Sequence, residues 1–190
     1  ADIGTWDVSN VTNFSGMFYN TEIFNKDISA WNVGKATDMS SMFKASYDDS
    51  KGDPIFNQPL HNWDVSNVTN MSHMFNGCFR FNQNIDTWDV SSVTDMSYMF
   101  MMGNKFNQPL NSWNVSNVTN MSYMFNSAIS FNQPLNNWDV SSVTGMRDMF
   151  NYTWEFNQPL NSWNVGNVTD MTSMFNSATS FNQPISNWDV

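Results

Sequence analysis

Tryptophan recurs along this chain at a fixed interval, and that interval constrains the fold more than any other feature of the sequence. Neighbouring members of the series lie 25 residues apart, with one interval of 32: Trp6, Trp31, Trp63, Trp88, Trp113, Trp138, Trp163 and Trp188. A period of this length, held along the chain, indicates repeated units that bury their apolar side chains only against their neighbours. We therefore expect residues 1–190 to form a single array of about seven coils in which the indole rings stack, with an insertion at 44–55.

Within each repeat the apolar residues change their spacing. The Trp-x-Val element has the two-residue step of a strand, whereas the residues after it recur at steps of three, six and seven, as on one face of a helix: Val143, Met146, Met149 and Phe150. The spacing predicts one short parallel strand and one short helix in every 25-residue repeat. A parallel strand-helix repeat implies a right-handed crossover, so the predicted fold class is a right-handed α/β solenoid.

Composition and charge exclude several classes of function. The chain carries 17 acidic and 7 basic residues, a net charge of -10, which argues against a nucleic-acid partner because phosphate binding needs clustered Lys and Arg. The sequence has no apolar run near the roughly 20 residues needed to span a bilayer, so we expect no direct membrane insertion. The single cysteine, Cys78, excludes an internal disulfide framework, and we expect its side chain to be buried.

Chemistry-bearing motifs are sparse. The two histidines, His61 and His73, fall at different positions of the repeat and do not form a metal-binding pair, and no nucleophile motif or phosphate-binding loop is present. We therefore expect no enzyme, no catalytic residues and no cofactor.

One column of polar residues suggests a cation site. The residue after each repeat Trp is Asp or Asn, and the two-residue period of a strand turns this position outward, away from Trp and Val. Asp64 and Asp89 are adjacent members of this column, and carboxylate oxygens are ligands that suit Ca²⁺. The hypothesis is Ca²⁺ bound at this pair or in the insertion, at Asp48, Asp49, Ser50 and Asp53; the alternative is a solvated polar column.

Aromatic and methionine residues at variable repeat positions form the predicted binding site. Protein contact surfaces are enriched in such side chains. Tyr98 and Tyr123 share one repeat position, and four further residues lie at neighbouring positions: Phe79, Met102, Tyr152 and Trp154. The alternative is that these side chains fold back over the coil edge.

Other surfaces leave two more functions open. Neither terminus carries a polar capping unit, so we expect a fragment of a longer protein, and open ends favour end-to-end self-association into a filament or stalk. A regular row of threonines makes an ice or carbohydrate surface binder a further alternative: Thr12, Thr37, Thr69, Thr94, Thr119, Thr144 and Thr169.

The repeat resembles a known family. Its Leu-x-x-Trp-x-Val-x-x-Val-x-x-Met-x-x-Met-Phe spacing is similar to that of a leucine-rich repeat, and the Trp-Asp-Val-Ser-x-Val-Thr-x-Met-x-x-Met-Phe block resembles BspA-like leucine-rich-repeat surface proteins. The resemblance implies a cell-surface or secreted location and adhesion to a protein or glycan on another cell or matrix. The sequence therefore predicts a non-catalytic binding module.

Overall fold

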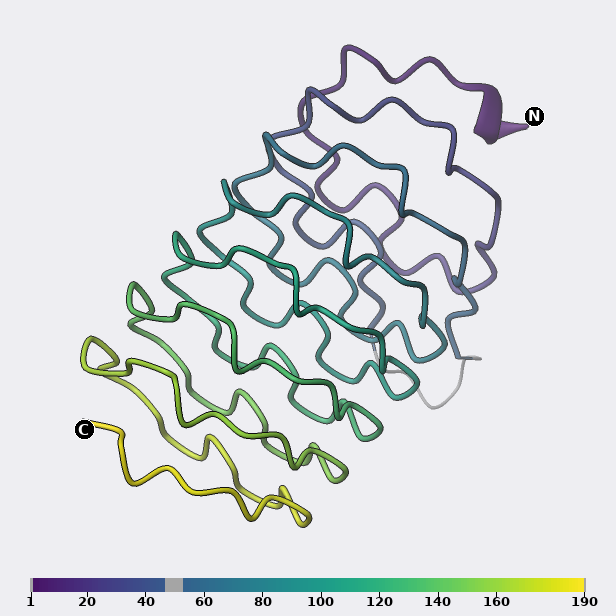
Figure 1. Cartoon of the computed structure of the whole chain (residues 1–190). Coiled ribbons are helices and arrows are strands. Elements are labelled where there is room, and N and C mark those ends of the chain that lie inside the picture. The colour runs from purple at the N-terminus through teal and green to yellow at the C-terminus, as the bar shows by residue number, and fades with distance from the viewer. Residues whose placement is uncertain (1, 47–52, 190) are drawn as a thin grey trace.

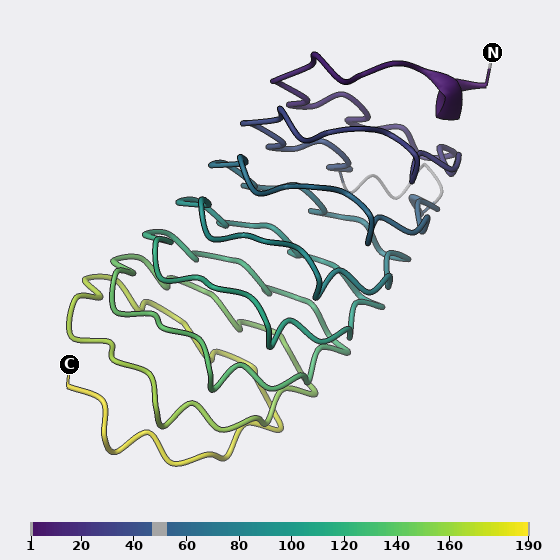
Figure 2. The same cartoon turned by 45° about the horizontal axis from the view of Figure 1, so that its top comes forward.

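The computed structural model describes residues 2–46 and 53–189, which form a stack of similar coils with the two ends of the chain at opposite ends of the stack (Figure 1). Viewed after a rotation, successive coils still lie side by side (Figure 2). The only helix in the described residues is the single-turn η1, Ile3–Thr5, whose N-terminal amide of Gly4 donates to the side chain of Asp2. Within the same described residues, pairing of β type is limited to isolated parallel bridges, such as Asn70 with Asp95 and Asp95 with Asn120.

The predicted α/β solenoid, with a strand and a helix in every repeat, is therefore wrong. The residues predicted to be helical form consecutive β-turns instead, and the Trp-x-Val element forms no strand within residues 2–46 and 53–189. The amide of Trp138 donates three residues back to Leu135, and the amide of Val143 donates three residues back to Val140. Each end of the Trp-x-Val element thus lies in a turn.

Backbone hydrogen bonding explains why neither regular element forms. In the segment 71–78 the amides of Met71, His73, Phe75 and Gly77 donate to carbonyls of the next coil, at Asp95, Ser97, Met99 and Met101. The amides of Met74, Asn76 and Cys78 donate three residues back within the coil, and the amide of Ser72 donates to Oδ1 of Asn70. In a helix every backbone amide would donate to a carbonyl of the same segment, and in a strand the amides would donate to carbonyls of a neighbouring segment. Here the two patterns alternate, and we call this segment and its equivalents the turn ribbon.

The turn ribbon has a left-handed backbone at two places in every coil except the one with the ribbon at 39–46, where Ser41 alone of the described residues has a positive φ. In the turn Met71–Met74 the third residue, His73, has φ 59°, and in Phe75–Cys78 the third residue, Gly77, has φ 74°. A positive φ at the third residue of a hydrogen-bonded turn is the type II pattern, which favours Gly or Asn. Equivalent positions elsewhere carry Tyr98, Tyr123 and Tyr152, so this geometry is imposed on residues that do not prefer it.

Ladders of aromatic rings fill the interior of the stack. The predicted stacking of indole rings is confirmed for five neighbouring pairs, with ring centroids 6.3 to 6.5 Å apart. The indole nitrogen of Trp113 donates to the carbonyl of Ile85 in the preceding coil at 3.1 Å, and the equivalent bond recurs along the column. Phenylalanines continue the pattern, with the rings of Phe100 and Phe125 at 5.7 Å. The core is thus continuous from coil to coil.

A second ladder, made of asparagine side chains, links each coil to the next. The Oδ1 atom of Asn82 accepts the backbone amide of Asn107 at 2.9 Å and the side-chain amide of Gln108 at 3.1 Å. The same contacts recur where the Asn-Gln pair repeats, with these acceptors: Asn57, Asn107, Asn132 and Asn157. One side-chain oxygen therefore satisfies two donors of the next coil.

No helix in the described part of the chain has the length and apolar character that crossing a membrane requires.

Replacing Trp113 by Phe should lower the free energy of unfolding by about 2–4 kcal/mol, because the Ile85 carbonyl loses its donor and the smaller ring leaves a void. Trp113 is buried, whereas Trp6 is 49% exposed, so Trp6→Phe is the matched control and should cost less than about 1 kcal/mol. Chemical denaturation measures both. Equal losses would show that the buried indole bond does not stabilise the stack.

Candidate functional site

The six residues of the predicted binding site separate into two groups in the structure. Tyr98 and Tyr123 lie in the middle of the turn ribbon, where they continue a column begun by His73; these three residues are the tyrosine ladder. The other four lie at or just after the end of the ribbon. Together with Ile129, which occupies the same repeat position as Phe79 and Trp154, we call them the ribbon-end patch: Phe79, Met102, Ile129, Tyr152 and Trp154.

In the tyrosine ladder the faces of neighbouring rings stack on one another. The rings of His73 and Tyr98 lie 4.2 Å apart, and those of Tyr98 and Tyr123 lie 4.5 Å apart, each pair within 10° of parallel. At the far end, Nε of Arg147 donates to the Tyr123 hydroxyl at 2.9 Å, and the same nitrogen lies 3.3 Å from the Asp148 carboxylate. A ligand therefore meets ring edges and hydroxyl groups at this ladder.

Burial sets the electrostatics of the ladder. Desolvation, and next the nearby Lys44 ammonium, lower the pKa of His73, whose Nδ1 lies 3.0 Å from the side-chain amide nitrogen of Asn76. Desolvation, and next the neighbouring Tyr123, raise the pKa of Tyr98. Both shifts favour neutral rings, which suits the close stacking of the ladder. The ladder therefore stabilises the packing between coils, and part of it is exposed at the surface.

Tyr152 and Trp154 differ from the ladder because neither ring stacks on another ring in the described residues. Each is 47% exposed, and within the described residues neither ring stacks on another ring or forms a side-chain hydrogen bond. Backbone bonds hold both in place: the amide of Tyr152 donates to Asn176 at 2.9 Å, and the carbonyl of Trp154 accepts from Ser180 at 3.2 Å. The other members of the ribbon-end patch are half-buried.

Tyr152 also has a left-handed backbone, with φ 56°. Such a conformation costs a bulky residue on the order of 1–3 kcal/mol. Tyr98 and Tyr123 share this conformation, but their ring stacking offsets the cost. The half-exposed ring of Tyr152 has no such contact in the part of the chain that the structure describes, whereas other coils place Ser127 or Ser177 at this position.

Asp64 and Asp89, the predicted cation ligands, are exposed as expected, but each carboxylate turns back to its own coil. Oδ1 of Asp64 accepts from the amide and hydroxyl of Ser66, and Oδ1 of Asp89 accepts from the amide of Ser91. In residues 2–46 and 53–189, no group of three or more His, Cys, Asp or Glu side chains is placed to hold a metal ion. Asp53 is exposed, and the other predicted ligands of the insertion, Asp48, Asp49 and Ser50, lie outside the described residues.

Cys78 is buried, as predicted. Its thiol donates to the carbonyl of Phe43 at 3.0 Å, and burial raises its pKa well above the ordinary value, so the thiol stays protonated. Such a thiol is a poor nucleophile.

The threonine row is exposed along its whole length and regular in its bonding. The amide of Thr94 donates to the carbonyl of Thr69 at 2.9 Å, and the hydroxyl of Thr94 donates to the same carbonyl at 3.2 Å. The other coils repeat this pair of bonds. The hydroxyl protons are therefore used between coils, and within the described residues no helix begins at these threonines. The ice or carbohydrate function stays a prediction.

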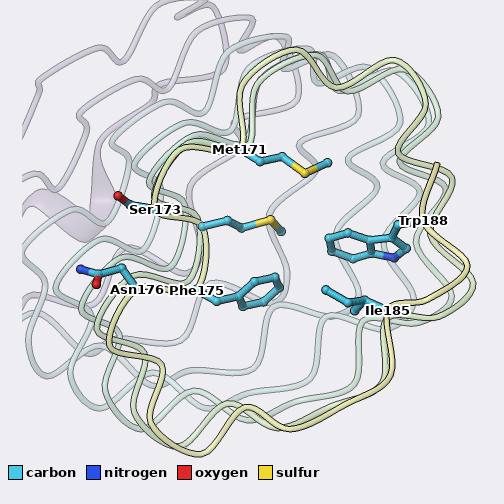
Figure 3. A pocket seen from close by; sticks show the side chains of 7 residues that line it. Met171, Ser173, Phe175, Asn176, Ile185 and Trp188 are labelled. Atoms are coloured by element: carbon cyan, nitrogen blue, oxygen red, sulfur yellow. The ribbon is translucent and has the colours of Figure 1, made fainter. Parts of the chain in front are cut away.

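A pocket of about 720 Å³ opens at the C-terminal end of the stack (Figure 3). Met171 and Phe175 point into it from one side and Ile185 and Trp188 from the other, whereas Ser173 and Asn176 point away. Residues at the same repeat positions are buried in inner coils, for example Met146 for Met171. The pocket is thus the end of the apolar core. End-to-end self-association would bring such end surfaces of two molecules together, and it stays a prediction.

Two features of the site escaped sequence reasoning. Arg147 stands where other coils carry Ser or Thr, and it joins Tyr123 to the nearly buried Asp148, whose Oδ1 also accepts from Asn151. The asparagine ladder is the second, although the recurring Asn-Gln pair was its signal. In both features a side chain bonds to a residue of another coil: Arg147 to Tyr123, and Asn82 to Asn107.

The bonded columns define a repeat protein built from stacked coils. Comparison with protein families gives three overlapping matches to the description "Mycoplasma protein of unknown function, DUF285", over residues 1–54, 49–153 and 104–190. The chain belongs to this family. No curated protein and no solved structure gives a match in the corresponding comparisons.

The exposed carboxylates predict a stability change in acid. Hydrogen bonds from the hydroxyl and amide of Ser91 and of Ser141 lower the pKa values of Asp89 and Asp139 below the ordinary 3.8. Because the folded-state pKa values are lower, the stabilisation is present above pH 3.8 and is lost as the pH falls through the folded-state values.

The test replaces Asp89 and Asp139 by Asn, the residue that Asn114 supplies at the same repeat position. At neutral pH the wild-type chain should melt at a higher temperature than this double variant, and the difference should shrink as the pH falls below about 4. Melting curves followed by circular dichroism measure it. A difference that does not change with pH would contradict the proposed charge-assisted bonds.

Tyr98→Ser and Tyr152→Ser should have different effects on stability, although both place at a left-handed position the residue that other coils carry there. Loss of two ring contacts at Tyr98 should cost about 1–3 kcal/mol, whereas the change at Tyr152 should stay within about 0.5 kcal/mol or stabilise the fold. Denaturant titration of the two variants measures the contrast. A larger loss at Tyr152 would place its ring in the core.

Proposed function

We propose that this repeat protein is a non-catalytic protein-binding module of the adhesion type, secreted or held at a cell surface. In this proposal the ribbon-end patch, centred on Tyr152 and Trp154, contacts the partner, and the rest of the stack holds that patch in place. The tyrosine ladder supports the surface from within and is not the main contact.

The exposure of two large aromatic side chains whose rings are unstacked in the described residues carries this proposal. Tryptophan and tyrosine dominate the energetic centres of protein interfaces, because each buries a large apolar area at a small cost in side-chain entropy. Tyr152 and Trp154 lie two residues apart, with half-buried Ile129 at the same repeat position as Trp154 in the adjacent coil. Water around these rings is released when a partner covers them, which favours association.

The backbone at Tyr152 supports the same conclusion. A tyrosine in the left-handed region costs folding free energy that its contacts in the described part of the chain do not return, and strain of this kind concentrates at functional sites. Serine at this position in adjacent coils shows that the turn itself does not need an aromatic ring. A partner that covers the ring explains why the residue is tolerated there.

Variation along the stack also supports a specific contact. The coil 138–162 keeps the core residues of the repeat yet differs from its neighbours at several partly or fully exposed positions, which carry Gly145, Arg147, Tyr152 and Trp154. Repeat proteins recognise their partners through surface residues that differ between repeats, whereas the core residues are the same from repeat to repeat.

The surface location and the adhesive role rest on the resemblance of the Trp-Asp-Val-Ser-x-Val-Thr block to BspA-like surface proteins. The partner is a protein or a glycan on another cell or matrix, and the aromatic patch favours a protein.

The test uses the double variant Tyr152→Ser, Trp154→Thr, since Ser177 and Thr179 occupy these positions in the next coil. Immobilised wild-type chain should retain cultured cells or matrix proteins, and the double variant should retain at least about tenfold less at unchanged melting temperature. Ile23→Ser is the matched control, because Ile23 is 88% exposed and lies in the first coil. Equal retention by the double variant and the control would refute the proposal.

A further inference from the structure

We infer that the Tyr152–Trp154 pair binds a lysine or arginine side chain within a basic segment of a protein partner. This inference rests on the proposed function and specifies the chemistry of the partner. Three observations carry it: the exposure of the two unstacked rings within the described residues, the carboxylate of Glu155, which follows Trp154 in the sequence, and the acidic balance of the whole chain.

The first observation concerns the rings. The face of an aromatic ring attracts a cation placed within about 6 Å of its centroid, most strongly for tryptophan. Trp154 and Tyr152 are each 47% exposed and form no ring stack in the described residues, so a cation has access to the exposed part of each ring. In the tyrosine ladder the same access is blocked, because the ring of Tyr98 is covered on both sides.

The second observation concerns the charge beside Trp154. The Glu155 side chain is exposed and forms no ion pair within residues 2–46 and 53–189. Lys105 and Arg80 share its repeat position but lie two and three coils earlier. At about 4.8 Å per coil, Lys105 is roughly 10 Å away, near the screening length at physiological salt. Arg147 is already held by Tyr123 and Asp148. The cation that pairs with Glu155 therefore comes from the partner.

The third observation separates possible partners. A net charge of -10 repels acidic glycans and acidic proteins at long range and speeds the encounter with a basic segment. A neutral sugar gains nothing from this field. A flexible segment that carries Lys or Arg satisfies the rings, the carboxylate and the field together, so it is the occupant that the surface fits.

The experiment measures binding of a short labelled peptide, in which Lys and Arg alternate with Gly and Ser, by fluorescence anisotropy. The comparison peptide has Gln at every basic position. We expect the wild-type chain to bind only the basic peptide, with an affinity that falls as salt rises from about 0.05 M to about 0.5 M. Trp154→Thr should weaken binding about tenfold and Glu155→Gln about threefold or more.

Asp139→Asn is the matched control for Glu155→Gln. It removes one exposed carboxylate of the same coil, and Asn occupies that repeat position in the next coil, at Asn164. We expect it to leave peptide affinity unchanged. An equal loss in the two charge variants would overturn the inference, because binding would then follow net charge and not the site. Equal affinity for the basic and Gln peptides would also overturn it.

The retention assay with cells or matrix proteins separates this inference from the proposed function. If Tyr152→Ser, Trp154→Thr abolishes retention but Glu155→Gln and added salt leave it unchanged, the binding module stands and the cationic partner is refuted. If the double variant retains its partner as well as the wild-type chain does, both are refuted. Melting temperatures of all variants confirm that each comparison is made on folded protein.

Discussion

The alternation of backbone amides between two kinds of acceptor is the interaction on which the rest of the structure depends. Along the turn ribbon, one amide donates to the next coil and the following amide donates three residues back, so almost every donor is satisfied without a helix or a strand. This pattern fixes the register between coils, since the residue pairs that these bonds bridge, such as Asn70 and Asp95, lie at equivalent repeat positions. It also explains why left-handed residues recur along the chain: each hydrogen-bonded turn with this geometry needs one.

Register in the backbone aligns the side chains, and aligned side chains form ladders. Indole and phenylalanine rings stack on their equivalents in the neighbouring coil, asparagine side-chain oxygens accept the backbone amide of the next asparagine, and threonine hydroxyls donate to the backbone carbonyl of the preceding threonine. Each ladder satisfies donors or buries apolar area that a single coil leaves uncovered, so a coil is stable only within the stack. Because these contacts occupy fixed repeat positions, the remaining outward positions are free to vary.

Variation at those free positions gives the molecule its candidate site. The rings of the tyrosine ladder stack on one another and stabilise the fold. Tyr152 and Trp154 are instead half-exposed and unstacked in the described residues, and Tyr152 has an unfavourable backbone conformation. A contact surface of this kind is held rigidly, because the backbone on both sides of each ring is bonded to adjacent coils. The proposed partner contacts therefore lie where the repeat departs from its own pattern.

The sequence by itself determined the period, the stacking of the tryptophans, the burial of Cys78 and the exposure of the Asp and Asn column, because each follows from regular spacing of side chains. It did not determine the secondary structure. Steps of three, six and seven are shared by a helix face and by consecutive turns, and only the inter-coil bonds of residues such as Met71 and Phe75 distinguish the two. Likewise, the sequence placed Tyr98 and Trp154 in one site. The tertiary structure separated them, because whether a ring face is covered depends on which rings the neighbouring coils bring against it.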